Sequence, residues 1–226
     1  MLAILLATAW SPAAAQVAGK LSLQSGYEVR GYSVSRGRPV GVLDFSYDDS
    51  SGFYLSQSTF GALPDHDDPG LLGLIGDAGY ARRLNSQLSI DGGIDHSEYI
   101  YAGSQHLHFG YTEIYAGLSL PHLSAHLSYS PAYFRSGAKT LYGEVEGNMG
   151  AFAGVRLNAH LGFLGYLAQP NSGGARGQYD WRFGASRQFG AFDLRAAVSG
   201  GGPDPDTYVQ TRHSKTAITV GAGYSF

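Results

Sequence analysis

TAITVGAGYSF, residues 216–226 at the carboxyl end of the 226-residue chain, has the pattern of a β-strand with two different faces. Successive side chains of a strand point to opposite faces, and the two faces of this stretch differ in character. One face carries Ile218, Val220, Ala222, Tyr224 and Phe226, and the other carries Ala217, Thr219, Gly221, Gly223 and Ser225. An apolar face that ends on an aromatic residue is typical of the closing strand of a bacterial outer-membrane β-barrel.

The same period-two alternation recurs along the whole chain, whereas no helix-length window carries a consistent apolar stripe. We therefore predict an all-β, antiparallel, up-and-down membrane β-barrel, for which an even number of strands is expected. The twelve predicted strands are residues 20–32, 39–48, 52–60, 71–83, 86–98, 107–119, 122–133, 140–149, 151–166, 178–189, 192–200 and 215–226.

Short and long connections alternate between these segments. The short ones are residues 48–52, 84–85, 120–121, 149–150 and 190–191, and the longer ones include 61–70, 167–178 and 201–214. Short turns on one rim and longer loops on the other are typical of an outer-membrane barrel. We expect the short turns and both termini on the periplasmic side and the longer loops outside the cell.

Charged residues avoid the apolar face of the predicted strands. In the segment 86–98, for example, Ile90 and Ile94 share one face while Asp91 and Asp95 share the other. A lipid-facing Arg or Lys at the midplane costs about 2–4 kcal/mol, so a bilayer would enforce this separation. A soluble β-sandwich is the alternative, in which the apolar faces would turn inward.

The amino terminus is predicted to be a signal peptide covering residues 1–15. An apolar run begins at Leu2, and small residues in Ala-x-Ala spacing follow it, which favours cleavage after Ala15. The run is too short for a membrane-spanning helix, which needs roughly 20 residues. Residues 16–226 then form a single barrel domain.

Composition excludes several classes of function. The chain has no cysteine, so it has neither disulfides nor a thiolate metal site, and we predict no cofactor. Its formal net charge of −3, with no basic run, argues against a nucleic-acid partner. The 33 Gly, 16 Tyr and 11 Phe suit short, twisted strands with aromatic residues at membrane interfaces.

The polar faces should line the lumen, and Glu113 is assigned to them because charge avoids lipid. The predicted lining residues are Glu28, Arg30, Asp44, Asp77, Asp91, Asp95, Glu113, Glu144, Glu146, Arg156, Asp180, Arg182, Asp193 and Arg195. Two interpretations stay open. The arginines either pair with neighbouring carboxylates and occlude the lumen, or the excess of carboxylates favours passage of cations and polar solutes.

The first and last predicted strands should close the barrel. This pairing would set Glu28 and Arg30 beside the nearly uncharged inner face formed by Thr219, Gly221 and Gly223. The seam is therefore predicted to be a roomy part of the wall.

Catalytic and metal sites have weaker support. His126 and Ser128 have the His-x-Ser spacing used by outer-membrane phospholipases, but their positions predict that they face inward. Residues 65–68, Asp-His-Asp-Asp, lack the glycine pattern of a calcium loop. His106 and His108 have no evident third ligand. We predict no enzyme activity and no metal site.

Four stretches resemble a known family. They are GYEVRGYS (residues 26–33), RPVGVLDFSY (38–47), SGFYLS (51–56) and YTEIYAG (111–117). They are similar to segments of the proteobacterial outer-membrane family Gcw_chp, whose members are conserved hypothetical β-barrels. The resemblance implies a barrel and a secretion route, and it supplies no catalytic residues.

Together these observations predict a narrow channel in the bacterial outer membrane for small polar or cationic solutes. The expected partners are outer-membrane lipid and the barrel-assembly machinery, which would bind the strand that ends at Phe226. The alternative is a closed structural or adhesive barrel whose long loops, especially residues 201–214, bind a partner.

Overall fold

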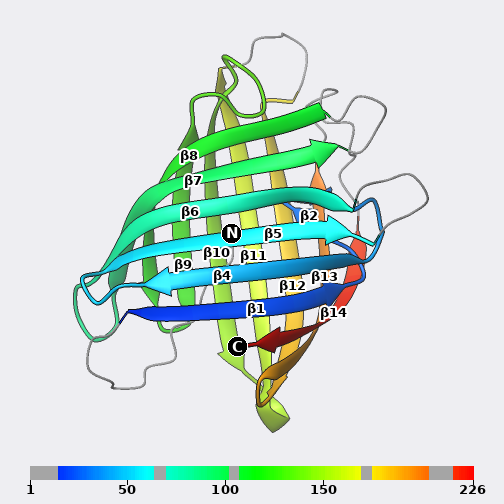
Figure 1. Cartoon of the computed structure of the whole chain (residues 1–226). Coiled ribbons are helices and arrows are strands. Elements are labelled where there is room, and N and C mark those ends of the chain that lie inside the picture. Colours follow the sequence, from blue (N-terminus) through cyan, green and yellow to red (C-terminus); the bar gives the residue numbers. More distant parts are fainter. Residues whose placement is uncertain (1–14, 64–69, 102–106, 169–174, 204–215) are drawn as a thin grey trace.

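Twelve antiparallel strands close into one barrel in the computed structural model, which describes residues 15–63, 70–101, 107–168, 175–203 and 216–226 (Figure 1). The wall strands are β1 (Gln16–Gln24), β4 (Val40–Asp48), β5 (Phe53–Ala62), β6 (Leu71–Arg83), β7 (Ser89–Tyr101), β8 (Leu107–Leu120), β9 (Leu123–Ser130), β10 (Lys139–Gly150), β11 (Val155–Ala168), β12 (Gly177–Phe189), β13 (Phe192–Gly202) and β14 (Ala217–Ser225). A separate hairpin consists of β2 (Glu28–Val29) and β3 (Tyr32–Ser33), and η1 (Phe152–Gly154) is a short 3-10 turn. The predicted fold class is confirmed.

The barrel closes between β1 and β14. Their register runs from Lys20 opposite Ser225 to Gln24 opposite Gly221. Phe226 extends this pairing, because its N–H donates to the Gly19 carbonyl at 2.9 Å and its carbonyl accepts from the Gly19 N–H at 2.8 Å. The last residue of the chain is therefore part of the seam.

Two predictions about the first strand are wrong. The strand expected at residues 20–32 runs instead from Gln16 to Gln24, and Glu28 and Arg30 belong to the β2–β3 hairpin rather than to the wall. The residues that face β14 across the seam are accordingly Lys20–Gln24, not Glu28 and Arg30. The alternation of residues 26–32 imitates a wall strand because a hairpin arm is also a strand.

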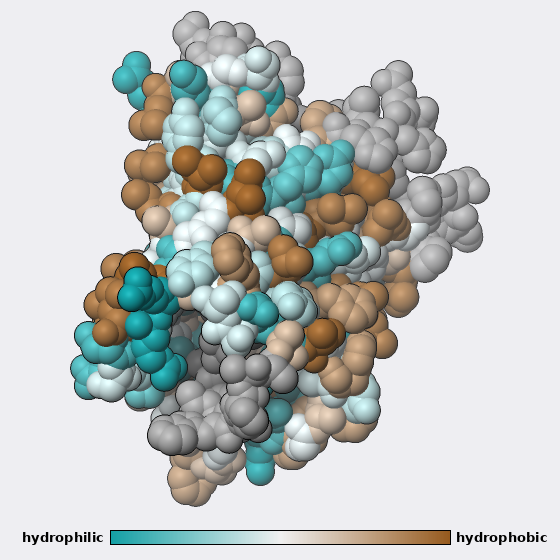
Figure 2. Space-filling view, turned by 60° about the vertical axis from the view of Figure 1, so that its left-hand side comes forward, coloured by the Kyte–Doolittle hydropathy of each residue, from teal (hydrophilic) through white to brown (hydrophobic). Residues whose placement is uncertain are grey.

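The outer surface of the barrel is apolar. Leu161 and Phe163 of β11 are each 59% exposed, and Ile218 of β14 is 78% exposed. Figure 2 shows hydrophobic residues at many places on one face, with pale and some hydrophilic residues between them. A soluble β-sandwich would bury such side chains, so the closed barrel with outward apolar residues rules this alternative out.

Connections follow the predicted alternation. The turns β4–β5, β6–β7, β8–β9, β10–β11 and β12–β13 are short, and they lie on the rim where β1 begins and β14 ends. The first described strand begins at Gln16, directly after the predicted cleavage site. Residues 1–14 lie outside the described residues, so the signal peptide stays a prediction. Within the described parts of the chain, no helix is both long enough and apolar enough to cross a membrane.

Candidate functional site

The β2–β3 hairpin turns inside the barrel. Its two-residue loop, Arg30-Gly31, joins Val29 to the paired Tyr32. Both loop residues have positive φ, 48° and 78°, which is the pattern of a type I′ turn. Arginine is an uncommon residue at the first of these positions, and its contacts supply the reason for its presence.

Arg30 reaches the barrel wall at Glu113 of β8. Its Nη1 donates to Oε1 at 3.1 Å and its Nη2 donates to Oε2 at 2.5 Å, which makes a two-pronged ion pair. The side chains of Arg30 and Glu113 are only 11% and 1% exposed. The guanidinium carbon also lies 3.9 Å from the centroid of the Tyr142 ring. A paired carboxylate and an aromatic face thus hold the buried cation.

Glu113 also fixes the charge of Arg30. Burial alone would lower the pKa of the guanidinium, but the adjacent carboxylate outweighs burial and holds this pKa well above its usual value. Arg30 is therefore a permanent cation at the tip of the hairpin.

The rest of the hairpin is held from other sides of the barrel. The Tyr32 hydroxyl donates to Gln178 of β12 at 2.7 Å, and the Ser199 hydroxyl of β13 donates to Glu28 at 2.6 Å. Ahead of the hairpin, the Tyr27 ring stacks on Phe60 of β5 at a centroid distance of 4.6 Å, and burial raises the pKa of Tyr27 to about 12. Contacts to strands on several sides place the hairpin across the interior.

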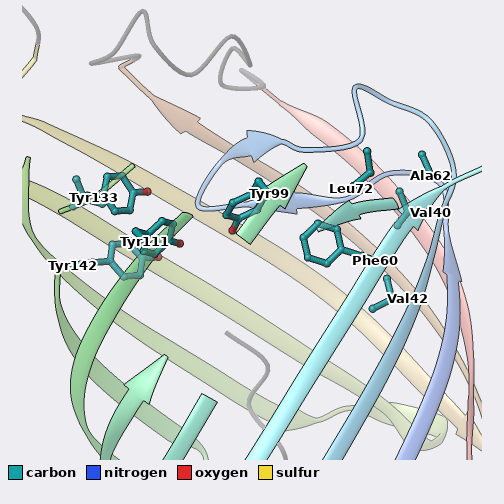
Figure 3. Packing of buried hydrophobic residues seen from close by; sticks show 10 residues of the cluster. Val40, Val42, Phe60, Ala62, Leu72, Tyr99, Tyr111, Tyr133 and Tyr142 are labelled. Atoms are coloured by element: carbon teal, nitrogen blue, oxygen red, sulfur yellow. The ribbon is translucent and has the colours of Figure 1, made fainter. Parts of the chain in front are cut away.

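A buried cluster surrounds these contacts. Figure 3 shows Tyr111, Tyr133 and Tyr142 gathered on one side, and Val40, Val42 and Phe60 on another. The full cluster is Val40, Val42, Phe60, Ala62, Leu72, Tyr99, Tyr111, Tyr133, Tyr142 and Leu164. Most of these residues lie in the loop-side halves of their strands, so this half of the barrel has a packed core.

Three of the predicted carboxylates form a row across neighbouring strands. Asp77 of β6 pairs in register with Asp95 of β7, and Asp95 pairs with Glu113 of β8. Like charges directly opposite each other are unfavourable, and Arg30 supplies a cation at the end of this row. Ser56 donates a hydrogen bond to Asp77.

A second chain of ionisable groups begins at Tyr142. The Tyr142 hydroxyl donates to Asp180 at 3.1 Å, and Asp180 lies 2.7 Å from His160 Nε2. Glu144 lies 3.9 Å from His160 and 3.9 Å from His126, and His126 Nε2 lies 3.4 Å from Asp91. We call the chain formed by Asp91, His126, Glu144, His160 and Asp180 the interior belt; it spans β7 to β12.

The remaining predicted residues lie at other places. Arg182 pairs with Glu146 at 3.2 Å, and Glu146 lies 3.3 Å from His160, which joins both to the interior belt. Near the seam, Asp193 pairs with Lys20 at 2.5 Å and with Arg195 at 3.3 Å. Asp44 accepts a hydrogen bond from Ser58 at 2.5 Å, and Arg156 is exposed near the β10–β11 turn. Their role in lining a solute path stays a prediction.

Three residues that take part in the interior ion pairs were not among the predicted lining residues. They are Lys20, His126 and His160. Their positions in the strands could have predicted that they face inward, because each shares a face with predicted lining residues or with polar neighbours. His160, for instance, lies on the same face as Arg156. A rule that counts only carboxylates and arginines overlooks histidines that bridge them.

The geometry gives little support to a lipid-active enzyme. Ser128 is 1% exposed, and His126 lies between Asp91 and Glu144. Attack on membrane lipid needs a nucleophile that lipid can reach, and this hydroxyl is buried. Within the described residues no group of three His, Asp or Glu side chains could hold a metal ion. Residues 65–68 and His106 lie outside the described part, and the side chain of His108 is not described.

A closed wall, an apolar exterior and an ionisable interior define a β-barrel of the outer-membrane porin and channel fold. The "KdgM porin" superposes with a TM-score of 0.53 at 18% identity, covering 94% of this chain and 99% of that chain. The "NanC porin" superposes with a TM-score of 0.57 at 9% identity, covering 92% of this chain and 99% of that chain. The "COG4313 outer membrane channel from Pseudomonas putida F1" superposes with a TM-score of 0.57 at 12% identity, covering 96% of this chain and 97% of that chain.

The family is also defined. The chain belongs to the family described as "Bacterial protein of unknown function (Gcw_chp)", whose model matches residues 7–223. This match confirms the resemblance seen in the sequence. No curated protein sequence matches the chain significantly.

Proposed function

We propose that this protein is an outer-membrane channel that passes small polar or cationic solutes along its interior belt. The observation that carries this proposal is the excess of carboxylates around the belt. The acidic residues concerned are Asp77, Asp91, Asp95, Glu113, Glu144, Glu146 and Asp180, and the arginines facing them are Arg30 and Arg182. Carboxylates that line a narrow, poorly solvated passage raise the local concentration of cations and repel anions.

The hairpin sets the width of the proposed passage. Because Arg30 holds the hairpin tip against β8, solutes must pass beside residues 28–33 rather than through an open lumen. Side chains fill the interior of eight-stranded barrels, whereas sixteen-stranded porins contain an open channel. With twelve strands, this barrel is intermediate in width. Small solutes are therefore the class that this interior suits.

The outer surface supports the proposed location. Exposed aromatic residues gather toward the rim of short turns, where Phe226 packs edge-on against Phe45 with a centroid distance of 6.2 Å. Phe192 and Tyr224 lie beside each other at 5.0 Å on the same rim. Such rings favour the boundary between lipid and water. We also propose that the barrel-assembly machinery recognises β14, which ends in this rim.

A second candidate is a closed barrel that binds a partner through its loops. The packed core around Tyr111, Tyr133 and Tyr142 favours this candidate, because it fills the loop-side half of the interior. In this account the ion pair of Arg30 is a permanent lock, and the barrel is a rigid platform for the long loops.

Conductance in planar lipid bilayers separates the two candidates. The purified wild-type protein is compared with a variant in which residues 26–37 are replaced by a short Gly-Ser linker. The channel proposal expects conductance from the wild type and a larger conductance from the variant. A silent wild type beside a conducting variant supports the closed barrel, and it overturns the channel proposal.

A further inference from the structure

Two ionisable residues interrupt the apolar outer wall. Asp95 of β7 is 8% exposed and faces inward, whereas Ile94 is 48% exposed and faces outward. His96 and Glu98 share the outward face with Ile94, because side chains two apart in a strand lie on one face. In the described wall strands the other outward charged side chains, Arg82, Lys139 and Arg187, lie within two residues of a strand end.

Neighbouring wall residues accommodate the outward His96 and Glu98. The His96 side chain is 54% exposed, its Nε2 lies 3.6 Å from Glu98, and its Nδ1 lies 2.9 Å from the Thr112 hydroxyl. Glu98 lies over Gly110 so closely that a Cβ at residue 110 would overlap its carboxylate. Glycine at this position therefore makes room for a charged side chain on the outside of the barrel.

Polar residues continue on the strands beside this pair. His96 pairs in register with Thr112 on one side and with Gly76 on the other, and Gly76 pairs with Gln57 of β5. Gln57 is exposed and donates to the Thr59 hydroxyl at 3.3 Å. We call this surface the outer polar patch; its polar members are Gln57, Thr59, His96, Glu98 and Thr112.

A second copy of the chain carries groups that complement this patch. Lipid tails offer the outer polar patch no hydrogen bonds, and an anionic headgroup would meet the carboxylate of Glu98. The Cα atoms of His96 and Glu98 lie about 7 Å apart along the strand, and an imidazole N–H can donate a hydrogen bond to a carboxylate. A two-fold axis between them would place His96 of each copy opposite the partner's Glu98, which is the reciprocal pairing of a symmetric interface.

We propose that the outer polar patch is the contact through which two copies of this chain pair in the membrane. The pairing surface is the outer face of β5 to β8. Gly76, which has no side chain, allows two walls to approach closely there. This proposal does not depend on conduction through the barrel, because it concerns the lipid-facing side only.

Cross-linking in the membrane tests the proposal. The chain has no cysteine, so Thr112→Cys introduces a single thiol within the patch. Outer membranes that contain the full-length variant are treated with a short, membrane-permeable bismaleimide. The expected result is a covalent dimer on a denaturing gel. The matched control is Ala196→Cys, at an exposed position on β13 across the barrel, which should stay monomeric. Absence of a Thr112→Cys dimer, or equal yields from both variants, overturns the proposal.

A charge exchange tests the reciprocal pairing. His96→Glu makes the patch acidic and Glu98→Lys makes it basic, so each variant in the Thr112→Cys background should lose the cross-link. Co-expression of the two should restore it, because each supplies the charge that the other needs. Heat-dependent gel migration verifies that both variants fold. Unchanged cross-linking in either variant alone, or no recovery on co-expression, contradicts the pairing. A monomer that carries a phospholipid adduct in native mass spectrometry would assign the patch to lipid instead.

Discussion

Arg30 and Glu113 form a two-pronged ion pair inside the barrel although 83 residues separate them in the chain. The pair joins the tip of an inward hairpin to the middle of wall strand β8. Neither side chain has more than 11% of its surface exposed, so each charge depends on the other. The position of the hairpin, and with it the shape of the interior, therefore rests on this pair.

Glu113→Gln should destabilise the barrel. It leaves the Arg30 guanidinium buried without its carboxylate, and the loss of one partner of a buried ion pair costs about 3 kcal/mol or more. The measurement is the free energy of unfolding by urea in lipid vesicles. Glu146→Gln is the comparison: it removes the carboxylate from Arg182, which is 46% exposed, and from His160 at 3.3 Å, so a smaller loss is expected than for Glu113→Gln. Equal losses in both variants would contradict the special role of the buried pair.

Arg30→Asn should loosen the hairpin without spoiling its turn. Asparagine tolerates the positive φ of residue 30, but it cannot reach Glu113 as a bidentate cation. The channel proposal expects a higher single-channel conductance than in the wild type, with more frequent fluctuations. Arg38→Asn, in the same connection but beyond the hairpin, is the comparison. Identical conductance traces for Arg30→Asn and the wild type would show that the hairpin does not limit the passage.

Gly19→Val should weaken the seam. A Cβ at residue 19 would overlap the ring of Phe226, whose backbone pairs with Gly19. Because the Phe226 ring is 60% exposed and must turn away from residue 19, the expected cost lies at the lower end of the roughly 1–3 kcal/mol that overpacking costs. The readout is the temperature at which the folded form, recognised by its gel migration, is lost. Gly41→Val, at an outward position with open space around it, serves as the control. Adding Phe226→Ala to Gly19→Val should recover part of the loss, and no recovery would place the strain elsewhere.

The wall could be predicted from the sequence because a bilayer enforces a strict alternation. Lipid on one side and a polar interior on the other make most of the wall carry the same pattern, as Ile90 and Asp91 illustrate, and the outward His96 and Glu98 of β7 are the exception. The predicted bounds of β6, residues 71–83, coincide with the observed ones. The residue pattern of each strand reflects its lipid face and its interior face, so a wall strand can be predicted without knowledge of its contacts elsewhere in the chain.

The inward hairpin could not be predicted in the same way. Tyr27 and Val29 alternate with Glu28 and Arg30 as they would in a wall strand, and only Gly26 and the Arg30-Gly31 pair hint at turns. The distinction depends on a partner far along the chain, Glu113. Local patterns cannot reveal such a contact. The bridging contacts of His126 and His160 were not predicted for a related reason, since these histidines join carboxylates from different strands.

Ion selectivity should show whether the interior carboxylates favour the passage of cations. The measurement is the reversal potential of the wild-type protein in a planar bilayer that separates two KCl concentrations. We expect a potential whose sign shows preference for K⁺, and a smaller potential for the Asp91→Asn, Glu146→Gln double variant. Asp49→Asn, in the exposed β4–β5 turn, should leave the potential unchanged. A wild-type potential whose sign shows preference for Cl⁻ would contradict the account.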